Sequence, residues 1–547
     1  MSGNGSKPST NGGARPGNRL ATAVQLLMGG KHQEAIGTLH EVLATEPNNK
    51  EALHMLGVIA CKAGDHQAGV SLLSRAVDLD PNDAAALYNL GNAYRSLKQM
   101  APAADNYRRA LKLAPDNSLA CHALADTLVA LRQPEEAVKY YEQALSADEN
   151  DITVGARLAV LYEQRNEESR ARELAEKLIA REPDHPVLNL VLARCDKRDG
   201  HFDAAIDRLE KVIDANEDAR QDFRLHYELG RLYDKQDQAD AAIQSFHRAN
   251  TIQRANWSDE DWPGPSSVQY IDMQADAFTA DWVATWTQTP PMVVDETPVF
   301  LIGFPRSGTT LLDQILDSHP ALRVLEEKPA VASMRAYISG LPGGYPAALA
   351  TLGADDFVEL RKIYFGCAES FMEGDRSARL VDKLPLNTTR AGLIYRIFPD
   401  AKFIFALRHP HDVILSCYMQ DFVVNSAMSN FLDLADAADY YAKSLLLWNR
   451  FVELLPLKVH FVRYESLVRD VETEAREVSK FLELPFDETV LDFSAHARSR
   501  GRINTPSYHQ VSQPVYTSAV DRWRKYEGHL EPIIEKLKPF VKQFGYE

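Results

Sequence analysis

A period of 34 residues runs through the first half of the chain. Small residues keep this spacing at Ala35, Gly69, Ala103, Ala137, Ala171 and Ala205. A second column with the same spacing holds Pro47, Pro81, Pro115 and Pro183, and Glu149 and Glu217 fill the two other places in that series. A unit of this length accommodates two helices, which cross closely at the small residues, and proline ends the second helix. The period therefore predicts a stack of helical hairpins.

The third unit shows the pattern in full. It carries Leu87, Leu90, Gly91, Tyr94, Ala103, Tyr107, Ala110 and Pro115. This arrangement resembles the tetratricopeptide repeat (TPR). The resemblance predicts an all-α TPR superhelix over residues 21–252, with six complete units and an atypical last one. It also implies a protein or peptide ligand on the concave face.

The segments that flank the repeats differ in composition. Residues 1–20 lack a hydrophobic stretch, which predicts a disordered tail and not a secretory signal. Residues 253–296 hold four of the six tryptophans, so we expect a connector packed between two domains. No apolar run is long enough for a membrane span. The net charge of −17 argues against nucleic-acid binding, and we expect a cytoplasmic protein.

Residues 297–547 have the pattern of an α/β domain. Apolar runs at 298–303, 402–408 and 459–465 predict buried strands, each followed by turn residues and a helical stretch. Such an alternation predicts a parallel sheet covered on both faces. Ligands of these sheets bind beyond the carboxyl ends of the strands, so the residues that follow the strands are the candidates for a functional site.

The first of these turns has the layout of a phosphate-binding loop. Gly303 and Gly308 permit tight backbone geometry, and the next amides begin a helix whose dipole favours an anion. Thr309 and Thr310 add hydroxyl donors, and Arg306 adds a planar guanidinium suited to a tetrahedral oxyanion. The lysine of the motif GxxxxGK[ST] is absent. The loop therefore predicts an anion site unlike that of an ordinary NTPase.

Residues after the other two predicted strands extend this site. Arg408 ends the second strand, and Ser416 follows about two helical turns later. Together they can bind a second phosphate. Tyr464 stands at the carboxyl end of the third strand, where it either packs near a base or ribose or belongs to the core.

Residues 297–545 resemble the sulfotransferases that use 3′-phosphoadenosine-5′-phosphosulfate (PAPS), and tyrosylprotein sulfotransferases in particular. The segment GFPRSGTTLLDQILDSHPALRVLEEKP is similar to the 5′-phosphosulfate loop of that family and the residues after it. The resemblance implies that Arg408 and Ser416 bind the 3′-phosphate and that Tyr464 contacts the cofactor. It implies a P-loop-like site for the sulfated 5′-phosphate made by Arg306, Ser307, Gly308, Thr309 and Thr310.

The same resemblance assigns the catalytic roles. The family's base is the second Glu of a Glu-Glu pair, 21 residues after the loop arginine, and this is Glu327 here. Lys383 in RLVDKLPLN matches the catalytic lysine. Ser507 in SYHQVSQPVY matches a serine that binds the donor and supports the transition state. Arg522, before Trp523, stands where the family has a cofactor-binding lysine.

Some features depart from the family pattern. Gln420 stands where the family has a further arginine near the 3′-phosphate, and Lys328-Pro329 follow Glu327 where the family has an arginine. The second difference affects the region that faces the acceptor. The animal members also carry a Golgi membrane anchor, whereas repeats before the transferase resemble bacterial members of the superfamily.

Other residues compete for the role of catalytic base. Cytosolic small-molecule sulfotransferases use a histidine, and His319 stands at the end of the helix after the loop, where histidine is commonly structural. Glu326 is the neighbour of Glu327, which only the family spacing favours. Any of them would take the proton of an acceptor hydroxyl. We expect no metal ion, because the sequence has no metal-ligand spacing.

The sequence leaves three functions open. The favoured one is transfer of the sulfuryl group of PAPS to a protein tyrosine, with the TPR units recruiting a protein partner or substrate; a glycan, lipid or small-molecule hydroxyl is the alternative acceptor. The second is an NTPase or kinase, which the missing loop lysine disfavours. The third is a TPR scaffold with an inactive nucleotide-binding domain, which the joint presence of the candidate residues disfavours.

Overall fold

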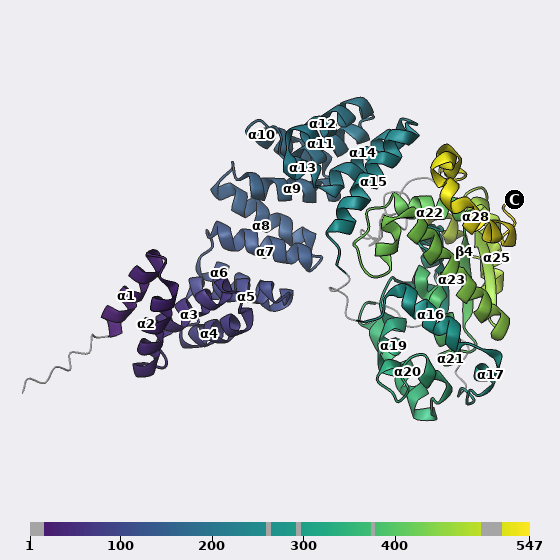
Figure 1. The fold of residues 1–547 in the computed structure, drawn as a ribbon, viewed down its shortest axis with the longest axis horizontal. Helices are drawn as coiled ribbons and strands as arrows, with labels where there is room; N and C mark the ends of the chain where they lie inside the picture. Colours follow the sequence, from purple (N-terminus) through teal and green to yellow (C-terminus); the bar gives the residue numbers. More distant parts are fainter. Residues whose placement is uncertain (1–15, 259–263, 291–296, 373–377, 494–516) are drawn as a thin grey trace, which may run out of the picture. The chain divides into compact units, whose positions relative to one another are not determined.

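The computed structural model describes residues 16–258, 264–290, 297–372, 378–493 and 517–547. The chain divides into two compact units, Met1–Asn216 and Glu217–Glu547 (Figure 1). Within the described ranges the first unit consists of helices, and the second contains a parallel sheet with helices packed on it. The predicted fold class, helical repeats followed by a parallel α/β domain, is confirmed.

Antiparallel helical hairpins build the first unit. Its helices are α1 (Pro16–Met28), α2 (His32–Thr45), α3 (Lys50–Lys62), α4 (His66–Leu79), α5 (Ala84–Ser96), α6 (Met100–Leu113), α7 (Ser118–Ala130), α8 (Pro134–Ala147), α9 (Ile152–Gln164), α10 (Glu168–Ile179), α11 (Pro186–Arg198) and α12 (Phe202–Ala215). Helix α1 begins inside the segment for which composition predicts disorder. Its first residue is a proline, which is favoured at a helix start because its missing N–H has no helical partner there.

The repeat period also governs how the helices begin. The first helix of successive hairpins is capped by one column of side chains, Asn49, Asp83, Asn117, Asp151 and His185. Each accepts a hydrogen bond from a backbone amide of the first turn. Asn and Asp caps of this kind contribute about 1 kcal/mol each.

A small residue permits close packing within the third hairpin. A Cβ atom at Gly91 of α5 would lie 2.6 Å from the ring of Tyr107 of α6. Tyr107 is fully buried, and its hydroxyl donates to Asn92 Oδ1 at 2.7 Å. The glycine in this column is therefore required by the aromatic residue that it faces.

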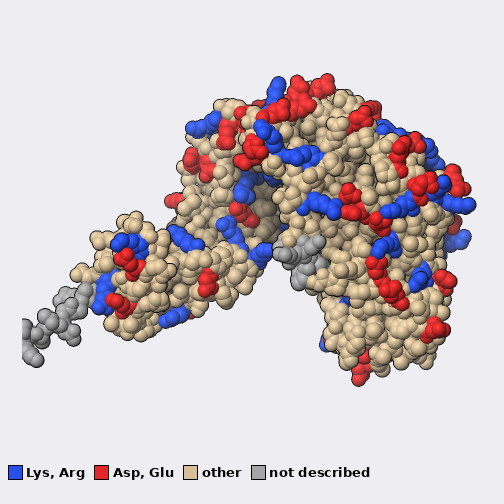
Figure 2. Space-filling view, in the orientation of Figure 1, with Lys and Arg blue, Asp and Glu red and all other residues tan. Residues whose placement is uncertain are grey.

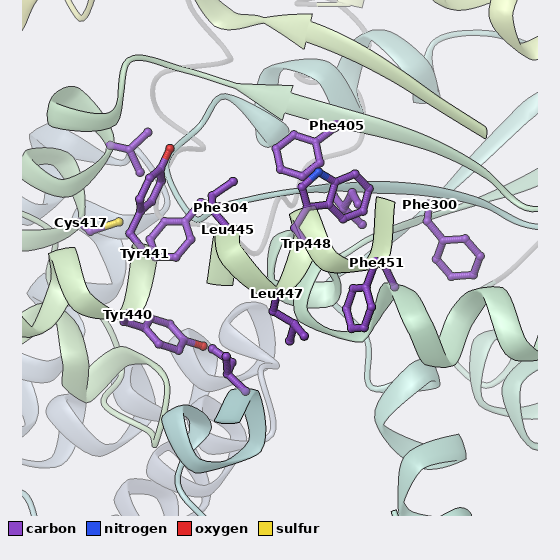
Figure 3. Packing of buried hydrophobic residues seen from close by; sticks show 14 of the residues in the cluster. Phe300, Phe304, Phe405, Cys417, Tyr440, Tyr441, Leu445, Leu447, Trp448 and Phe451 are labelled. Atoms are coloured by element: carbon purple, nitrogen blue, oxygen red, sulfur yellow. The ribbon is translucent and has the colours of Figure 1, made fainter. Parts of the chain in front are cut away.

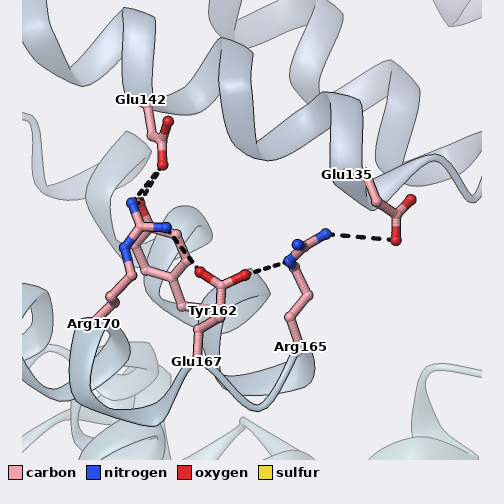
Figure 4. Close-up of polar contacts among 6 residues, drawn as sticks. All are labelled: Glu135, Glu142, Tyr162, Arg165, Glu167 and Arg170. Carbon is pink, nitrogen blue, oxygen red and sulfur yellow. Dashed lines mark hydrogen bonds and ion pairs between the residues drawn. The ribbon is translucent and has the colours of Figure 1, made fainter. Parts of the chain in front are cut away.

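Polar side chains add contacts between hairpins (Figure 4). The guanidinium of Arg170 lies 2.6 Å from Glu142 and 2.8 Å from Glu167, and it stacks 4.0 Å above the ring of Tyr162. Arg165 joins the network through Glu167 at 2.6 Å. Because these side chains are between 26% and 52% exposed, each ion pair is worth only about 0.2–1 kcal/mol. Burial of the apolar columns dominates the stability of the array.

The sheet of the second unit has five strands in the order β2-β3-β1-β4-β5, all parallel. They are β1 (Val299–Gly303), β2 (Leu322–Glu326), β3 (Arg379–Lys383), β4 (Lys402–Leu407) and β5 (Lys458–Arg463). The three strands expected from apolar runs are β1, β4 and β5. Strands β2 and β3 are not predicted from the sequence, because charged residues such as Arg323, Glu326 and Arg379 interrupt their short apolar patterns.

Alternate residues of the central strands enter two separate buried clusters. Phe300 and Phe405 belong to the cluster that includes Trp448 of α23 (Leu434–Leu454), whose ring lies 4.8 Å from that of Phe405 (Figure 3). Leu301 and Ile404 belong to the other cluster. The sheet is therefore buried on both faces, as its continuous apolar strands predict.

The second unit contains further helices. They are α13 (Glu217–Arg220), α14 (Phe223–Lys235), α15 (Ala239–Ala255), α16 (Ser267–Ala277), α17 (Ala280–Ala284), α18 (Thr309–Asp317), α19 (Ala330–Ser339), α20 (Ala354–Glu369), α21 (Ala391–Ile397), α22 (Pro410–Tyr418), α24 (Tyr464–Leu467), α25 (Val471–Leu482) and α28 (Glu527–Gln543). Short 3₁₀ helices are η3 (Ala347–Ala350), η4 (Pro385–Arg390), η5 (Met428–Leu432), η6 (Glu488–Asp492) and η7 (Arg522–Tyr526). No helix in these ranges is long and apolar enough to cross a membrane.

The last repeat hairpin and the expected connector pack into the second unit. Helices α14 and α15 form an antiparallel pair that falls within Glu217–Glu547. Phe278, which follows α16, is buried against Phe451 of α23 with ring centroids 4.8 Å apart, and Trp282 lies 4.9 Å from it. We propose that residues 217–290 form a structural part of the α/β domain.

Charged side chains of both signs intermingle on the face shown in Figure 2.

Candidate active site

The loop between β1 and α18 is held by its glycines. Gly303 has φ +154°, and a Cβ atom there would lie 2.7 Å from the carbonyl oxygen of Ala406. Gly308 has φ +95°, and a Cβ atom there would lie 2.6 Å from the ring of Tyr464. Arg306 also adopts a left-handed conformation, with φ +69°. Such a backbone is costly for a residue other than glycine and is typical of functional turns.

The loop leads directly into α18. Gly308 is the N-cap of this helix and provides no side chain to its first-turn amides. Thr309 and Thr310 begin the helix and are almost fully buried. The hydroxyl of Ser307 donates to the carbonyl oxygen of Phe304 at 2.7 Å, which closes the turn. A helix start without a side-chain cap, at the end of a strand, is a favourable place for an anion.

Arg306, Arg408 and Ser416 converge on one side of the loop. Arg306 Nε donates to Ser416 Oγ at 3.0 Å, and Arg408 Nη1 donates to the carbonyl oxygen of Arg306 at 3.1 Å. Arg408 follows β4, and Ser416 lies on α22. The guanidinium of Arg408 also lies 5.0 Å from the ring of Tyr464. The tertiary structure thus brings together four residues that the sequence assigns to the cofactor.

Arg408 has unused hydrogen-bonding capacity. Its Nη2 donates to the carbonyl oxygen of Ala519 at 2.6 Å, but its buried Nε has no partner in the described part of the chain. The residue is only 7% exposed. An unpaired donor on a buried cation is costly, so it indicates a position that a ligand completes.

Lys383, the last residue of β3, lies among three carboxylates. Its Nζ is 2.9 Å from Glu327 Oε1, 3.1 Å from Asp313 Oδ2 and 3.5 Å from Glu326 Oε1. The register of the sheet pairs Glu326 with Lys383, and the amide of Glu327 donates to the carbonyl oxygen of Lys383 at 2.8 Å. Glu327 has φ +50°, which turns the chain sharply after the strand.

Burial and the neighbouring charges shift the pKa values of Lys383 and Asp313. Burial opposes the charged form of Lys383, which is fully buried, but the carboxylates of Asp313, Glu327 and Glu326 outweigh burial and raise its pKa. Burial raises the pKa of Asp313 to about 7, although Lys383 opposes this shift. The side chain of Glu327 is 39% exposed, whereas that of Glu326 is 10% exposed. Of the two glutamates, Glu327 is the more accessible to an acceptor.

Two residues near the site escaped the sequence analysis. Asp313 is fully buried on α18, and the signal for it was a carboxylate between the apolar residues Leu312 and Ile315. Thr388 Oγ1 donates to the carbonyl oxygen of Gly303 at 2.6 Å and accepts from the amide of Gly303 at 3.0 Å, so it holds the start of the loop. No local pattern identified Thr388.

The predicted residues His319 and Gln420 form hydrogen bonds with the protein backbone. Both ring nitrogens of His319 are engaged, Nε2 by the carbonyl oxygen of Pro485 at 2.9 Å and Nδ1 by the amide of Ala321 at 3.1 Å, which is a structural role. Gln420 donates to the carbonyl oxygen of Asp421 at 3.2 Å.

Arg522 does not contact the loop. It pairs with Asp234 of α14 at 2.8 Å. Ser507 lies outside the described residues.

Comparison with known proteins agrees with this arrangement. A family model described as the sulfotransferase family matches residues 298–488. Tetratricopeptide repeat models match residues 20–84, 84–117, 128–195, 164–221 and 223–256. Both resemblances that the sequence indicates are thereby confirmed.

Curated relatives match the second half of the chain. An uncharacterized protein of Aquifex aeolicus is 31% identical over 254 residues, which cover 45% of this chain and 33% of that protein. Protein-tyrosine sulfotransferase of Drosophila melanogaster is 26% identical over 46% of this chain, and protein-tyrosine sulfotransferase 1 of Danio rerio is 27% identical over 46%. The matches span 51% and 72% of those two proteins. A solved TPR protein of Parabacteroides merdae is 19% identical, with a TM-score of 0.36, over 46% of this chain and 96% of its own.

Proposed function

We propose that this chain, which carries a sulfotransferase family domain behind tetratricopeptide repeats, transfers the sulfuryl group of PAPS to the hydroxyl of a protein tyrosine. The observation that carries the proposal is the contact of Lys383 Nζ with Glu327 Oε1 at 2.9 Å, beside the loop of residues 303–310. It places an acid and a base together at the carboxyl edge of a parallel sheet, where such domains hold their ligands. The similarity to protein-tyrosine sulfotransferases supports the choice of acceptor.

The residues present fit a donor with two separate anionic groups. Arg306 and the first-turn amides of α18 would hold the sulfated 5′-phosphate. Arg408 and Ser416 would hold the 3′-phosphate, for which the unpaired Arg408 Nε is available. Tyr464, packed against Gly308 and Arg408, would support the nucleoside side of the site. We assign Ser507 and Arg522 to donor binding from the family resemblance.

The chemistry of the chain's own residues follows from their positions. When bound, PAPS supplies an activated sulfuryl group and a phosphate leaving group. Glu327 would accept the proton of the acceptor hydroxyl at a carboxylate oxygen, and the Lys383 ammonium would donate to the developing charge on the leaving phosphate. The carboxylates around Lys383 raise its pKa, so the ammonium that would donate to the leaving phosphate is present before the reaction. This division of roles requires no metal ion.

The repeats would recruit the protein that carries the acceptor. Arrays of this kind present a concave surface to peptides and partner proteins. We propose a protein partner or substrate for the first unit.

Mass spectrometry of acceptors tests the proposal. The full chain is incubated with PAPS and with tyrosine peptides, serine peptides, a glycan and a lipid. One sulfuryl group added to tyrosine supports the proposal, and transfer only to another acceptor class would reassign the substrate.

Calorimetry separates this function from that of an NTPase. Binding of adenosine 3′,5′-bisphosphate (PAP) without magnesium is expected. Magnesium-dependent ATP binding, with no affinity for PAP, would exclude a PAPS enzyme.

A further inference from the structure

The last repeat hairpin shares its core with the sulfotransferase domain. Tyr227 of α14 and Ala242, Phe246 and Ala249 of α15 belong to the same buried cluster as the sheet residue Phe300. An apolar face that is continuous with a domain core is a permanent part of that domain. The hairpin therefore has a fixed relationship to the elements that it touches.

Helix α15 contacts the carboxyl end of α22, the helix that carries Ser416. Asn250 Nδ2 donates to the carbonyl oxygen of Tyr418 at 3.0 Å, and Gln253 Nε2 donates to Asp421 Oδ1 at 2.9 Å. His247 Nδ1 lies 3.1 Å from the hydroxyl of Tyr418. Through these bonds the hairpin holds one end of the predicted 3′-phosphate helix.

Helix α14 contacts η7 through the carboxylate of Asp234, which makes three polar contacts. Asp234 accepts from Arg522 Nε at 3.2 Å, from Arg522 Nη2 at 2.8 Å and from the hydroxyl of Tyr526 at 2.8 Å. The side chains of Asp234 and Arg522 are 15% and 25% exposed. Two neighbouring pairs, Asp237 with Lys525 and Asp240 with His529, are far more exposed on the hairpin side, at 74% and 86%. Of these three ion pairs, that of Asp234 is the least exposed and has the most contacts.

The segment that contains Arg522 runs along α22. The carbonyl oxygen of Ala519 accepts from Arg408 at 2.6 Å, and the amide of Trp523 donates to Asp412 Oδ1 at 2.8 Å. Arg522 Nη2 lies 3.3 Å from Met419 Sδ, just after the helix. Asp234 occupies the Nε and Nη2 edge of the guanidinium, and Nη1 has no partner in the described ranges. Arg522 therefore lies on a segment that contacts both Arg408 and α22, the helix that carries Ser416.

We propose that Asp234, in the last repeat hairpin, is a positioning residue that orients Arg522 for the bound nucleotide, so that the hairpin is part of the nucleotide site; this inference rests on the proposed function. A bidentate carboxylate restricts the guanidinium to one plane before the nucleotide arrives. Its loss would leave a long flexible side chain that must be ordered on binding.

The sign of the change in PAP affinity distinguishes a positioning role of Asp234 from a purely electrostatic one. If Asp234 were only a counter-charge, its removal would strengthen the binding of an anion, by about twofold or less at a screened distance. Positioning predicts the opposite sign. Asp234→Asn should weaken PAP binding by about tenfold, because Arg522 is no longer held.

The test is isothermal calorimetry of PAP on the full chain, with Asp237→Asn as the matched control in the same hairpin. We expect Asp234→Asn to raise the Kd for PAP and the KM for PAPS by about tenfold, with kcat at saturating PAPS within about twofold of wild type. Asp237→Asn should leave both unchanged. Unchanged or tighter PAP binding to Asp234→Asn would overturn the inference.

A double variant distinguishes positioning of Arg522 from a general loss of folding stability. Arg522→Gln should weaken PAP binding by itself, and adding Asp234→Asn should then produce no further loss, because the two residues act as one unit. Additive losses would mean that Asp234 acts through the stability of the hairpin and would overturn the inference. If wild type does not bind PAP, the proposed function itself fails, which is a distinguishable result.

Discussion

Lys383 Nζ and Glu327 Oε1 lie 2.9 Å apart, at the carboxyl ends of two adjacent parallel strands. Lys383 is fully buried, while Glu327 is partly open to solvent. The pair therefore has one member anchored in the protein and one that can meet an acceptor.

Glu327→Gln should lower kcat by about 100-fold or more, because the amide cannot accept the acceptor proton. Single-turnover assays with saturating PAPS would measure the effect, and PAP binding should stay within about twofold of wild type. Glu326→Gln is the matched control, since its side chain is less accessible and lies farther from Lys383 Nζ. An equal loss in both variants would contradict the assignment of the base.

Lys383→Met should abolish turnover and destabilise the second unit by about 3 kcal/mol, because Asp313 is left as an unpaired buried carboxylate. Tryptophan fluorescence reports on this unit alone, since all six tryptophans lie between residues 257 and 523. Adding Asp313→Asn should restore stability without restoring turnover. Recovery of turnover in the double variant would show that Lys383 has no catalytic role.

The contribution of Asp313 to the stability of the second unit should fall as the pH rises from about 4 to about 7. Burial raises the pKa of Asp313 to about 7, above the value of about 3.9 for an unfolded aspartate. In this window the folded state binds more protons, so each pH unit costs up to about 1.4 kcal/mol. Lys383, whose pKa is raised, stays protonated throughout the window in both states.

Asp313→Asn should flatten this dependence. The comparison is the difference in urea midpoint between wild type and variant at pH 5 and pH 7, followed by tryptophan fluorescence. Asp382, whose pKa burial also raises to about 7, is present in both proteins and cancels. Parallel pH profiles would mean that Asp313 is ionised throughout this range.

Arg408→Gln should weaken PAP binding by about 10-fold or more, because the 3′-phosphate loses a buried cationic partner. Adenosine 5′-phosphosulfate, which has no 3′-phosphate, is the control ligand, and its affinity should change by about twofold or less. Ser416→Ala should act in the same direction with a smaller loss. Equal weakening of both ligands would indicate damage to the whole loop.

Gly91→Ala should destabilise the first unit by about 1–3 kcal/mol, because the new methyl group meets the ring of buried Tyr107. Circular dichroism would detect the loss, and tryptophan fluorescence of the second unit should not change. Gly37→Ala, on a helix where the added atom meets nothing within 4 Å, is the control and should be mildly stabilising. Similar effects at both positions would contradict the packing argument.

The repeat period, the loop of residues 303–310 and the spacing of Arg408 and Ser416 were readable because each depends on residues close in the chain. Their turn chemistry and helical periodicity are local. The strands β2 and β3 were missed for the opposite reason. Each has five residues of which two or three are charged, and two of these charges, Glu326 and Lys383, face each other in the folded sheet.

Contacts between residues that are far apart in the chain are evident only from the tertiary structure. Asp313 and Lys383 are brought together by the order of the parallel strands, and Asp234 meets Arg522 across 288 positions of sequence. A local pattern records which residues suit a helix, a strand or a turn. It does not record which buried charge will find which partner, because that pairing is set by the packing of the whole domain, where an unpaired charge is too costly to remain.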